Sequence, residues 1–176
     1  ADVPGVEIGD RVFGGAAGSF AELAAARAHP LATIPDGFGF DEAAALPVAA
    51  VTALQAVRDH GRVPPGQSVL INGAAGGVGT YAVQIAKAMG ADVTGVCSTR
   101  NVELVASLGA DHVVDYTRDD FTAEGRRYDV IVDNVSSRSI GDTRRALAPT
   151  GVLVVVGPPK KGNWIGMFIR PFAAKL

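Results

Sequence analysis

The sequence has one cysteine, few aromatic residues and no marked excess of charge. Cys97 stands alone among 176 residues, which excludes an internal disulfide and a zinc site built from several cysteines. The net charge of -2 gives no electrostatic reason to expect a nucleic acid or an anionic membrane as partner. We also expect no membrane span, because no apolar run approaches the length that a bilayer requires. The composition predicts a soluble, cytoplasmic protein without a metal site.

Glycine, by contrast, is abundant, and several glycines gather in the stretch Ser68–Gly79. This stretch begins with Ser68–Ile71, a short apolar run typical of a buried parallel strand. From Val78 the apolar residues recur at helical spacing, and Gly90 ends the run. The residues between strand and helix fit the pattern G-x-G-x-x-G, with Ala74 in place of the first glycine.

A strand, a glycine turn and a helix in this order can hold the pyrophosphate of a dinucleotide. The backbone must approach the phosphate closely, and the helix must present unpaired N–H groups and the positive end of its dipole. Gly76 would admit the pyrophosphate, and Gly79 would let the helix pack tightly on the strand. We therefore assign to the cofactor Ala75, Gly76, Gly77 and Val78. The alternative is a glycine turn that only joins strand to helix.

Beyond Gly90 the chain alternates between strands and helices. The expected strands are 92–96, 112–116, 128–133 and 151–156, and the expected helices are 101–108 and 139–147. This order implies right-handed crossovers and a parallel sheet with helices on both faces. The predicted fold class is therefore α/β, a doubly wound parallel sheet of the Rossmann type. We expect residues 117–127 to form a solvated turn and a short helix.

The first part of the chain has a different character, and its turn-rich sequence predicts a partial β-rich segment over residues 1–40. A helix over 41–60 should connect it to the nucleotide-binding domain, which we assign to 41–176. That helix is apolar almost all round, so it should be buried, with a kink or break at Pro47. The short elements expected before it are 11–13, 19–26 and 31–34. After Gly157 the pattern lapses, and the chain is expected to stop before its fold does.

Several motifs resemble one protein family. Gly9–Gly14, Ala43–Pro47 and Gly73–Gly79 are similar in order and spacing to the medium-chain dehydrogenase/reductase superfamily, in its zinc-independent quinone oxidoreductase and enoyl reductase branch. The resemblance implies that residues 1–40 are the C-terminal part of a GroES-like catalytic domain, and that the protein forms a homodimer, to which the apolar segment 163–172 could contribute. Leu23 and Leu54 depart from the family, which has aromatic residues there.

The end of the second strand bears on the choice of cofactor. An NAD-selective domain has a carboxylate there for the ribose hydroxyls, and this chain has Cys97. Ser98, Thr99 and Arg100 follow, and an arginine suits the 2′-phosphate of NADPH. We therefore predict NADPH, with Ser98 and Arg100 at the 2′-phosphate. The alternative for Arg100 is a solvent-facing side chain.

Four further residues complete the expected cofactor site. Asn134 and Gly157 follow strands at the carboxyl edge of the sheet, where open α/β sheets bind ligands. Ordinary turn roles are the alternatives for both. The resemblance adds Tyr116, near the phosphate, and Thr52, facing the cofactor. Packing and a bond to its own backbone are their respective alternatives.

Together with these residues, the resemblance implies an NADPH-dependent oxidoreductase that transfers hydride to a quinone or to an α,β-unsaturated carbonyl substrate. No catalytic residue is identified, and the three histidines, His29, His60 and His112, show no ligand spacing. One alternative is a non-catalytic NADPH-binding sensor or structural protein, and another is a zinc-dependent alcohol dehydrogenase whose ligands lie in missing sequence. A methyltransferase is disfavoured, since it would need an acidic residue where Cys97 stands.

Overall fold

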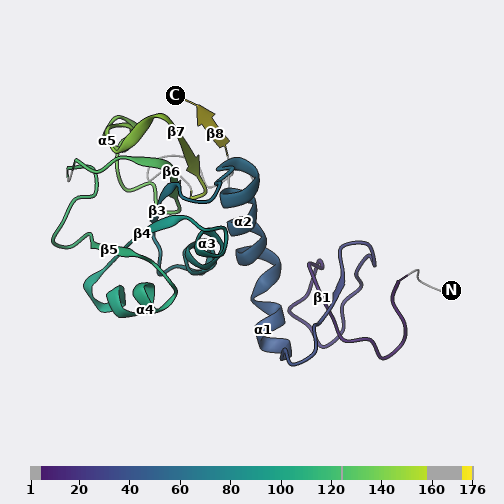
Figure 1. Cartoon of the computed structure of the whole chain (residues 1–176). Helices are drawn as coiled ribbons and strands as arrows, with labels where there is room; N and C mark the ends of the chain where they lie inside the picture. Colours follow the sequence, from purple (N-terminus) through teal and green to yellow (C-terminus); the bar gives the residue numbers. More distant parts are fainter. Residues whose placement is uncertain (1–4, 124, 158–171, 176) are drawn as a thin grey trace. The chain divides into compact units, whose positions relative to one another are not determined.

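The computed structural model of the chain describes residues 5–123, 125–157 and 172–175 (Figure 1). Its internal contacts divide the chain into two units, Ala1–Val51 and Thr52–Leu176. The division falls inside a long helical run, beyond the boundary at residue 40 that the sequence suggests. The assignment of residues 1–40 to a GroES-like domain stays a prediction.

The first unit contains little regular structure. Strands β1 (Val12–Phe13) and β2 (Ala32–Thr33) pair antiparallel, and helix α1 (Phe40–Ala44) follows. Arg11 ties the segment before α1 to β1, because its Nη2 donates to the Phe38 carbonyl at 2.8 Å and its guanidinium lies 4.7 Å from the centre of the Phe40 ring. The prediction of a regular element over 19–26 is wrong: these residues form bends and irregular backbone.

The helical run continues from α1 through segments of two widths. A π-helical segment (Leu46–Ala50, η1) is followed by α2 (Val51–Leu54) and by a second π-helical segment (Gln55–His60, η2). Pro47 explains the first widening, since it has no N–H to donate and its ring crowds the preceding turn. The Val51 N–H accordingly reaches back five residues to the Leu46 carbonyl. The α-helix itself ends at Ala44, Ala45 lies in a turn, and a π-helical segment begins at Leu46, so the regular helix is interrupted next to Pro47 as expected.

Burial changes along this run. Ala53, Ala56 and Val57 are fully buried in the second unit, whereas Val48 is 78% exposed and Val51 47% exposed. The expectation of a buried helix thus holds only for one face of its second half, because Gln55, Arg58 and Asp59 there are exposed.

By length and composition alone, the run Phe40–His60 could cross a membrane. It has 21 residues and reaches a mean hydropathy of 1.3, so the expectation that no apolar run approaches that length is wrong. One such helix is weak evidence for a membrane span, because the core helix of a soluble protein passes the same test. The burial of Ala53, Ala56 and Val57 makes the second half of this helix a core element.

The second unit is built on a six-stranded sheet in the order β5-β4-β3-β6-β7-β8 (Figure 1). The first five strands in this order pair parallel, which confirms the predicted doubly wound α/β fold. Strand β8 adds to β7 antiparallel and was not expected from the sequence. The strands are β3 (Ser68–Asn72), β4 (Asp92–Cys97), β5 (His112–Asp115), β6 (Tyr128–Asp133), β7 (Leu147–Val155) and β8 (Phe172–Lys175).

The two faces of this sheet bury separate cores. Val69 and Ile71 of β3 point to one face, where α2, η2, α3 (Gly77–Ala88) and α4 (Val102–Ser107) pack. Leu70 points to the other face, which α5 (Ile140–Arg145) and the segment after β5 cover. The same alternation recurs over residues 130–132 of β6, because a strand turns successive side chains to opposite faces.

Glycine lets the layers approach closely at one point of β4. A Cβ at Gly95 would lie 2.4 Å from Val105 Cγ1 of α4 and 3.1 Å from Ala74 Cβ. Contacts under 3.0 Å are essentially never made by real Cβ atoms. Helix α4 and the glycine turn can therefore sit against β4 only because residue 95 has no side chain.

Several element boundaries differ from the sequence expectation. Residues 117–127 contain turns and no helix in their described part, and Phe121 there is 3% exposed because it joins the core beneath the sheet. Helix α5 ends at Arg145, since Tyr128 N–H bonds the Ala146 carbonyl and draws the chain into β7. Strand β7 pairs Tyr128 with Leu147 and then Val130 with Val152, so the residues between bulge out. Of the expected apolar segment 163–172, residues 163–171 lie outside the described residues.

Candidate functional site

The candidate site is a hollow of about 450 Å³ at the carboxyl edge of the sheet. The chain runs from β3 outward to β5 and then crosses to β6 on the other side of β3, so the strand order reverses between β3 and β6. Ligands of open α/β sheets bind outside such a reversal. The hollow is lined by Gly73, Ala75, Gly76, Gly77, Val78, Gly79, Cys97, Ser98, Arg100, Asn101, Tyr116, Asn134 and Val135.

The glycine turn supplies one wall. Gly76 caps α3 with extended backbone, and the first bond into the helix runs from Thr80 N–H to the Gly76 carbonyl at 2.9 Å. The N–H groups of the first helical turn have no intrahelical partner, so they are available to an anion. A Cβ at Gly79 would lie 2.1 Å from the Gly73 carbonyl oxygen and 2.8 Å from Ala74 Cα. Glycine is needed at position 79 because α3 lies close against the turn that follows β3, at Gly73 and Ala74; packing on the strand itself was the expectation.

Two buried polar residues brace the floor between β3 and β6. Asp133 Oδ1 accepts from Asn72 Nδ2 at 2.8 Å, and also from the backbone N–H groups of Val135 at 3.1 Å and Ser136 at 2.8 Å. Asn72 is 4% exposed and Asp133 5% exposed. These bonds hold the turn after β6 against the end of β3. The pair was not predicted, because Asn72 and Asp133 are 61 residues apart in the sequence and meet only when β3 pairs with β6.

Asn134 and Gly157 lie close together beside this floor. Asn134 Nδ2 donates to the Asn72 carbonyl at 2.9 Å, while its Oδ1 is buried without a partner among the described residues. A Cβ at Gly157 would lie 2.2 Å from the Asn134 carbonyl oxygen, so only glycine fits there. Asn134 lines the hollow and Gly157 does not.

The turn after β4 forms the opposite wall. Cys97 is 2% exposed, and burial, with a smaller effect of Asp115, raises the pKa of its thiol. Ser98 Oγ accepts from Asn101 Nδ2 at 3.3 Å, which leaves the Ser98 hydroxyl proton free to donate. Arg100 lines the hollow and has no ion pair within the described part of the chain. This wall therefore offers a hydroxyl donor and an unpaired guanidinium.

Asp115, at the end of β5, is a polar residue of this edge that the sequence analysis missed. It is 8% exposed, and its carboxylate accepts from Thr99 Oγ1 at 2.5 Å and from Thr117 Oγ1 at 2.8 Å. The Thr99 bond is the largest of the effects that hold the pKa of Asp115 below its usual value. A detectable signal existed: Asn72, Asp115 and Asp133 each end a parallel strand, so all three meet at one edge.

The hollow thus gathers most of the predicted cofactor residues. Those that line it are Ala75, Gly76, Gly77, Val78, Ser98, Arg100, Tyr116 and Asn134, whereas Gly157 and Thr52 are not among the lining residues. Their roles toward a cofactor stay predictions. The described residues contain no group of three His, Cys, Asp or Glu side chains that could hold a metal ion.

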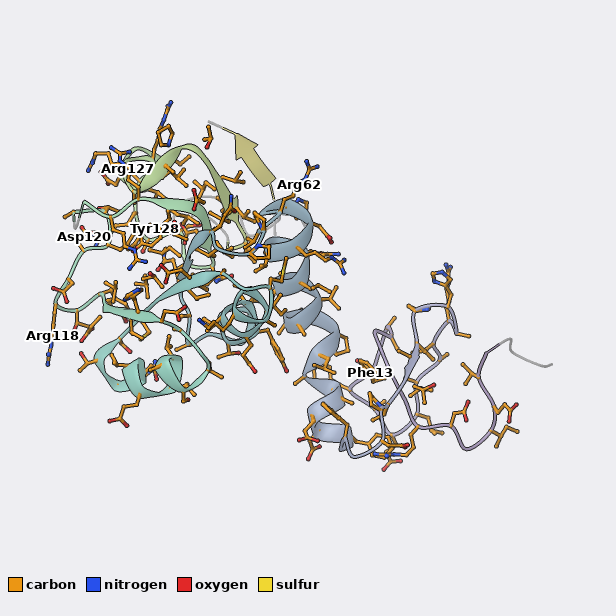
Figure 2. The ribbon with its side chains drawn as sticks, viewed as in Figure 1. Phe13, Arg62, Arg118, Asp120, Arg127 and Tyr128 are labelled. Atoms are coloured by element: carbon orange, nitrogen blue, oxygen red, sulfur yellow. The ribbon has the colours of Figure 1, made fainter. Side chains whose placement is uncertain are left out.

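A second hollow of about 450 Å³ lies at the opposite, amino edge of the same sheet. It has no glycine turn, and its charged lining residues are Asp59, Arg62 and Asp129. Arg62 lies just after the helical run (Figure 2) and, like Arg100, has no ion pair among the described residues.

A parallel sheet with a glycine turn, a helix N-terminus and a hollow at the strand reversal defines the Rossmann class of α/β fold, in which such a place binds dinucleotides. Comparison with known proteins makes this more specific. The family described as zinc-binding dehydrogenase matches residues 77–175. The chain therefore belongs to this family, in the quinone oxidoreductase and enoyl reductase branch of the medium-chain dehydrogenase/reductase superfamily.

Individual relatives agree with this placement. The chain is 37% identical over 160 residues to the chloroplast envelope quinone oxidoreductase homolog of Arabidopsis thaliana, covering 84% of this chain and 47% of the relative. It is 42% identical over 125 residues to the trans-enoyl reductase pgmF of Aspergillus terreus, covering 67% and 34%. The solved quinone oxidoreductase of Coxiella burnetii superimposes with a TM-score of 0.79 at 35% identity, covering 86% of this chain and 50% of that one. The chain thus spans less than half of these curated relatives.

Proposed function

We propose that this protein is an NADPH-dependent oxidoreductase that transfers hydride to a quinone or to the carbon–carbon double bond of an α,β-unsaturated carbonyl substrate. Membership of the oxidoreductase family indicates a nicotinamide cofactor. The names of the relatives, quinone oxidoreductase and trans-enoyl reductase, support the two substrate classes. A bound nicotinamide would supply the hydride, and the protein would bind and orient it.

One observation carries the preference for NADPH over NADH. Among the described residues that line the hollow there is an arginine, Arg100, and there is no carboxylate. A ribose with free hydroxyls favours a carboxylate at this place, whereas a 2′-phosphate favours an arginine. The free hydroxyl proton of Ser98 adds a second donor to the same wall.

The remaining lining residues fit the rest of a dinucleotide. Little room is left for a side chain at Gly76, because a Cβ there would lie 3.3 Å from the Gly73 carbonyl oxygen, so glycine lets a ligand approach the backbone. The N–H groups of Gly77 and Val78 begin a twelve-residue helix, whose dipole favours the negative pyrophosphate. We propose that these groups hold the pyrophosphate, and that Asn134 lies toward the nicotinamide side of the hollow.

The proposal also includes three properties on which the hollow does not bear. We propose that the protein is a homodimer, that it is cytoplasmic and that its catalysis does not require zinc. Zinc-independence rests on the resemblance to the quinone oxidoreductase branch, and metal analysis of the purified protein tests it.

The first experiment titrates the 176-residue chain with NADPH and with NADH, following nicotinamide fluorescence. We expect NADPH to bind more tightly, and Arg100→Ala to weaken NADPH binding by about tenfold or more, since a hydrogen bond to a charged group contributes roughly 1.5–3 kcal/mol. NADH binding should change little. Arg62→Ala is the matched control, because it removes an equally unpaired arginine from the other hollow.

Equal affinity of the unmodified chain for both cofactors would refute the NADPH assignment. The protein could bind NADPH selectively and yet, in a form that includes the whole catalytic domain, fail to oxidise NADPH with any quinone or enone tested. That result would support the non-catalytic alternative. Binding of neither cofactor, in a chain shown by circular dichroism to be folded, would mean that the glycine turn has only a structural role.

A further inference from the structure

The loops after β4 and β5 are joined by one carboxylate that does not itself line the hollow. Asp115 Oδ2 accepts the Thr99 hydroxyl at 2.5 Å, and Asp115 Oδ1 accepts the Thr117 backbone N–H at 3.0 Å and its hydroxyl at 2.8 Å. The two threonine hydroxyl oxygens are also 2.9 Å apart. We call Asp115, Thr99 and Thr117 the loop clamp.

The clamp residues alternate with residues that line the hollow. Thr99 stands between Ser98 and Arg100, and Thr117 follows Tyr116. Thr99 and Thr117 bond to the buried Asp115, while their chain neighbours line the hollow. The clamp therefore restrains the backbone that carries Ser98, Arg100 and Tyr116. The turn of 3₁₀-helix over Thr99–Asn101 is short and has no side-chain cap, so it depends on such outside contacts.

From this arrangement we propose that Asp115 is a positioning residue for cofactor selection: through Thr99 it holds Ser98 and Arg100 where a 2′-phosphate would sit. This inference rests on the proposed NADPH function. Asp115 would not touch the phosphate. It would reduce the conformational freedom that Arg100 must give up on binding, which is the usual benefit of a pre-organised site.

The charge of Asp115 is balanced without Arg100. Arg118 Nε lies 3.6 Å from Asp115 Oδ2, and Arg118 extends from the loop after β5 (Figure 2). The hydroxyl bond from Thr99 holds the pKa of Asp115 below its usual value, so the carboxylate is ionised at neutral pH. With Arg118 and the two threonines as its partners, Asp115 leaves the Arg100 guanidinium free for an anion.

The strands beneath the clamp are joined independently of it. Cys97 and Asp115 are register partners in the parallel pair of β4 and β5, and the Tyr116 N–H donates to the Cys97 carbonyl at 3.0 Å. Removal of the Asp115 side chain therefore leaves these backbone bonds in place. We expect such a variant to fold, with its effect confined to the two loops.

The test compares two matched pairs of variants in the full 176-residue chain. Asp115→Asn keeps the shape, since its Oδ1 can still accept from Thr117 and its Nδ2 can donate to Thr99 Oγ1, whereas Asp115→Ala removes the clamp. Thr99→Ser keeps the hydroxyl, whereas Thr99→Val replaces it with a methyl group of similar size. For each variant, the dissociation constants of NADPH and NADH and the melting temperature are measured.

We expect Asp115→Ala and Thr99→Val to reduce the preference for NADPH over NADH by about tenfold, with NADH affinity changed by no more than about twofold. Asp115→Asn and Thr99→Ser should keep the preference within about twofold. The ratio of the NADPH and NADH affinities is the decisive readout. If the loop clamp were merely structural, its loss would lower the melting temperature and leave this ratio unchanged.

Three results would overturn the inference. The ratio could stay unchanged in both Asp115→Ala and Thr99→Val, which would make the clamp structural. Asp115→Asn and Asp115→Ala could both raise NADPH affinity, which would show that the carboxylate repels the phosphate. If the unmodified chain binds NADPH and NADH equally well, both the proposed NADPH function and the role of the loop clamp are refuted. In that case Arg100→Ala should also leave the ratio of the two affinities unchanged. If Asp115→Ala does not fold, the pair at Thr99 decides.

Discussion

Two hollows of equal volume lie at opposite ends of the same parallel sheet, and their chemistry is different. At the amino edge, Asp129 Oδ2 accepts from the Ser68 N–H at 2.9 Å and from its hydroxyl at 3.0 Å, whereas Arg62 has no ion pair among the described residues. At the carboxyl edge, the lining is mostly glycine, alanine and valine, and a helix begins there with unpaired N–H groups. Volume alone therefore does not distinguish the two places.

The difference shows where close approach is required. Carboxyl-edge glycines exclude side chains because backbone atoms of neighbouring segments occupy the space, as at Gly79 and Gly157. The polar side chains of this edge, Asn72, Asp115 and Asp133, are bonded behind the lining and shape it. At the amino edge comparable carboxylates stabilise the fold without shaping a wall of small residues. Three experiments sharpen this contrast, in order of falling effect.

The largest effect is expected from Gly79→Ala. The new Cβ would lie 2.1 Å from the Gly73 carbonyl oxygen, so α3 and the turn after β3 must move apart. We expect a loss of about 3 kcal/mol in the free energy of unfolding and at least a tenfold loss of cofactor affinity. Urea unfolding and fluorescence titration measure these two quantities.

Gly141→Ala is the control for that change. A Cβ at Gly141 in α5 would lie 3.7 Å from Ser139 Oγ, an ordinary contact, so this variant should be neutral or up to about 1 kcal/mol more stable. If Gly79→Ala matched Gly141→Ala in both measurements, close packing at the carboxyl edge would not be the constraint that we describe.

A smaller effect is expected from the aspartates at the two edges. Asp133→Ala would leave Asn72 Nδ2 and two backbone N–H groups without their acceptor in a buried place, at a cost of about 2–3 kcal/mol. Asp129→Ala, at the amino edge, removes the acceptor of a half-buried serine and should cost about 1 kcal/mol. Only Asp133→Ala should also weaken NADPH binding. Equal effects of the two variants on cofactor affinity would contradict the proposed division of roles.

The smallest effect is expected at the ion pair between Lys87 and Asp111, also at the amino edge. The Lys87 bond, and then the Val93 N–H, hold the pKa of Asp111 below its usual value, so the stability that they contribute is present above about pH 4 and is lost as pH falls through the lower, folded-state pKa. Both side chains are partly exposed, so Lys87→Met should cost no more than about 1 kcal/mol at pH 7.

The pH dependence of that cost is the informative measurement. The difference in melting temperature between the unmodified chain and Lys87→Met should shrink as the pH is lowered from 7 toward 3, while cofactor affinity at pH 7 stays the same in both. A difference that grew in acid would mean that another group carries the interaction.

The sequence predicted those features that depend on neighbouring residues. The strand Ser68–Asn72, the glycine turn and α3 are contiguous, so local pattern was enough to find them and to explain Gly79. The parallel order of the strands followed from their alternation with helices. Most of the predicted cofactor residues meet at one hollow for the same reason: each follows a strand end on the carboxyl edge.

What the sequence did not predict depends on strand register or on strain relief. The hydrogen bonds of Asp133 with Asn72 and of Asp115 with Thr99 could not be predicted, because the sheet brings together residues that are far apart in the chain. Phe121 stands in a charged segment and is buried nonetheless, since the sheet face beneath it needs covering. An interruption of the helix near Pro47 was expected, but the π-helical form of the segment that follows it was not.

The close approach at Ala74 limits the order in which this chain could change by mutation. Ala74 is fully buried between Gly79 on one side and Gly95 on the other, and both glycines would collide with it or with its neighbours if they gained a Cβ. A larger residue at 95 needs a smaller one at Val105 first, because a Cβ there would lie 2.4 Å from Val105 Cγ1. A substitution path that begins at Gly95 therefore passes through a destabilised intermediate, and a path that begins at Val105 still meets the contact with Ala74 Cβ at 3.1 Å.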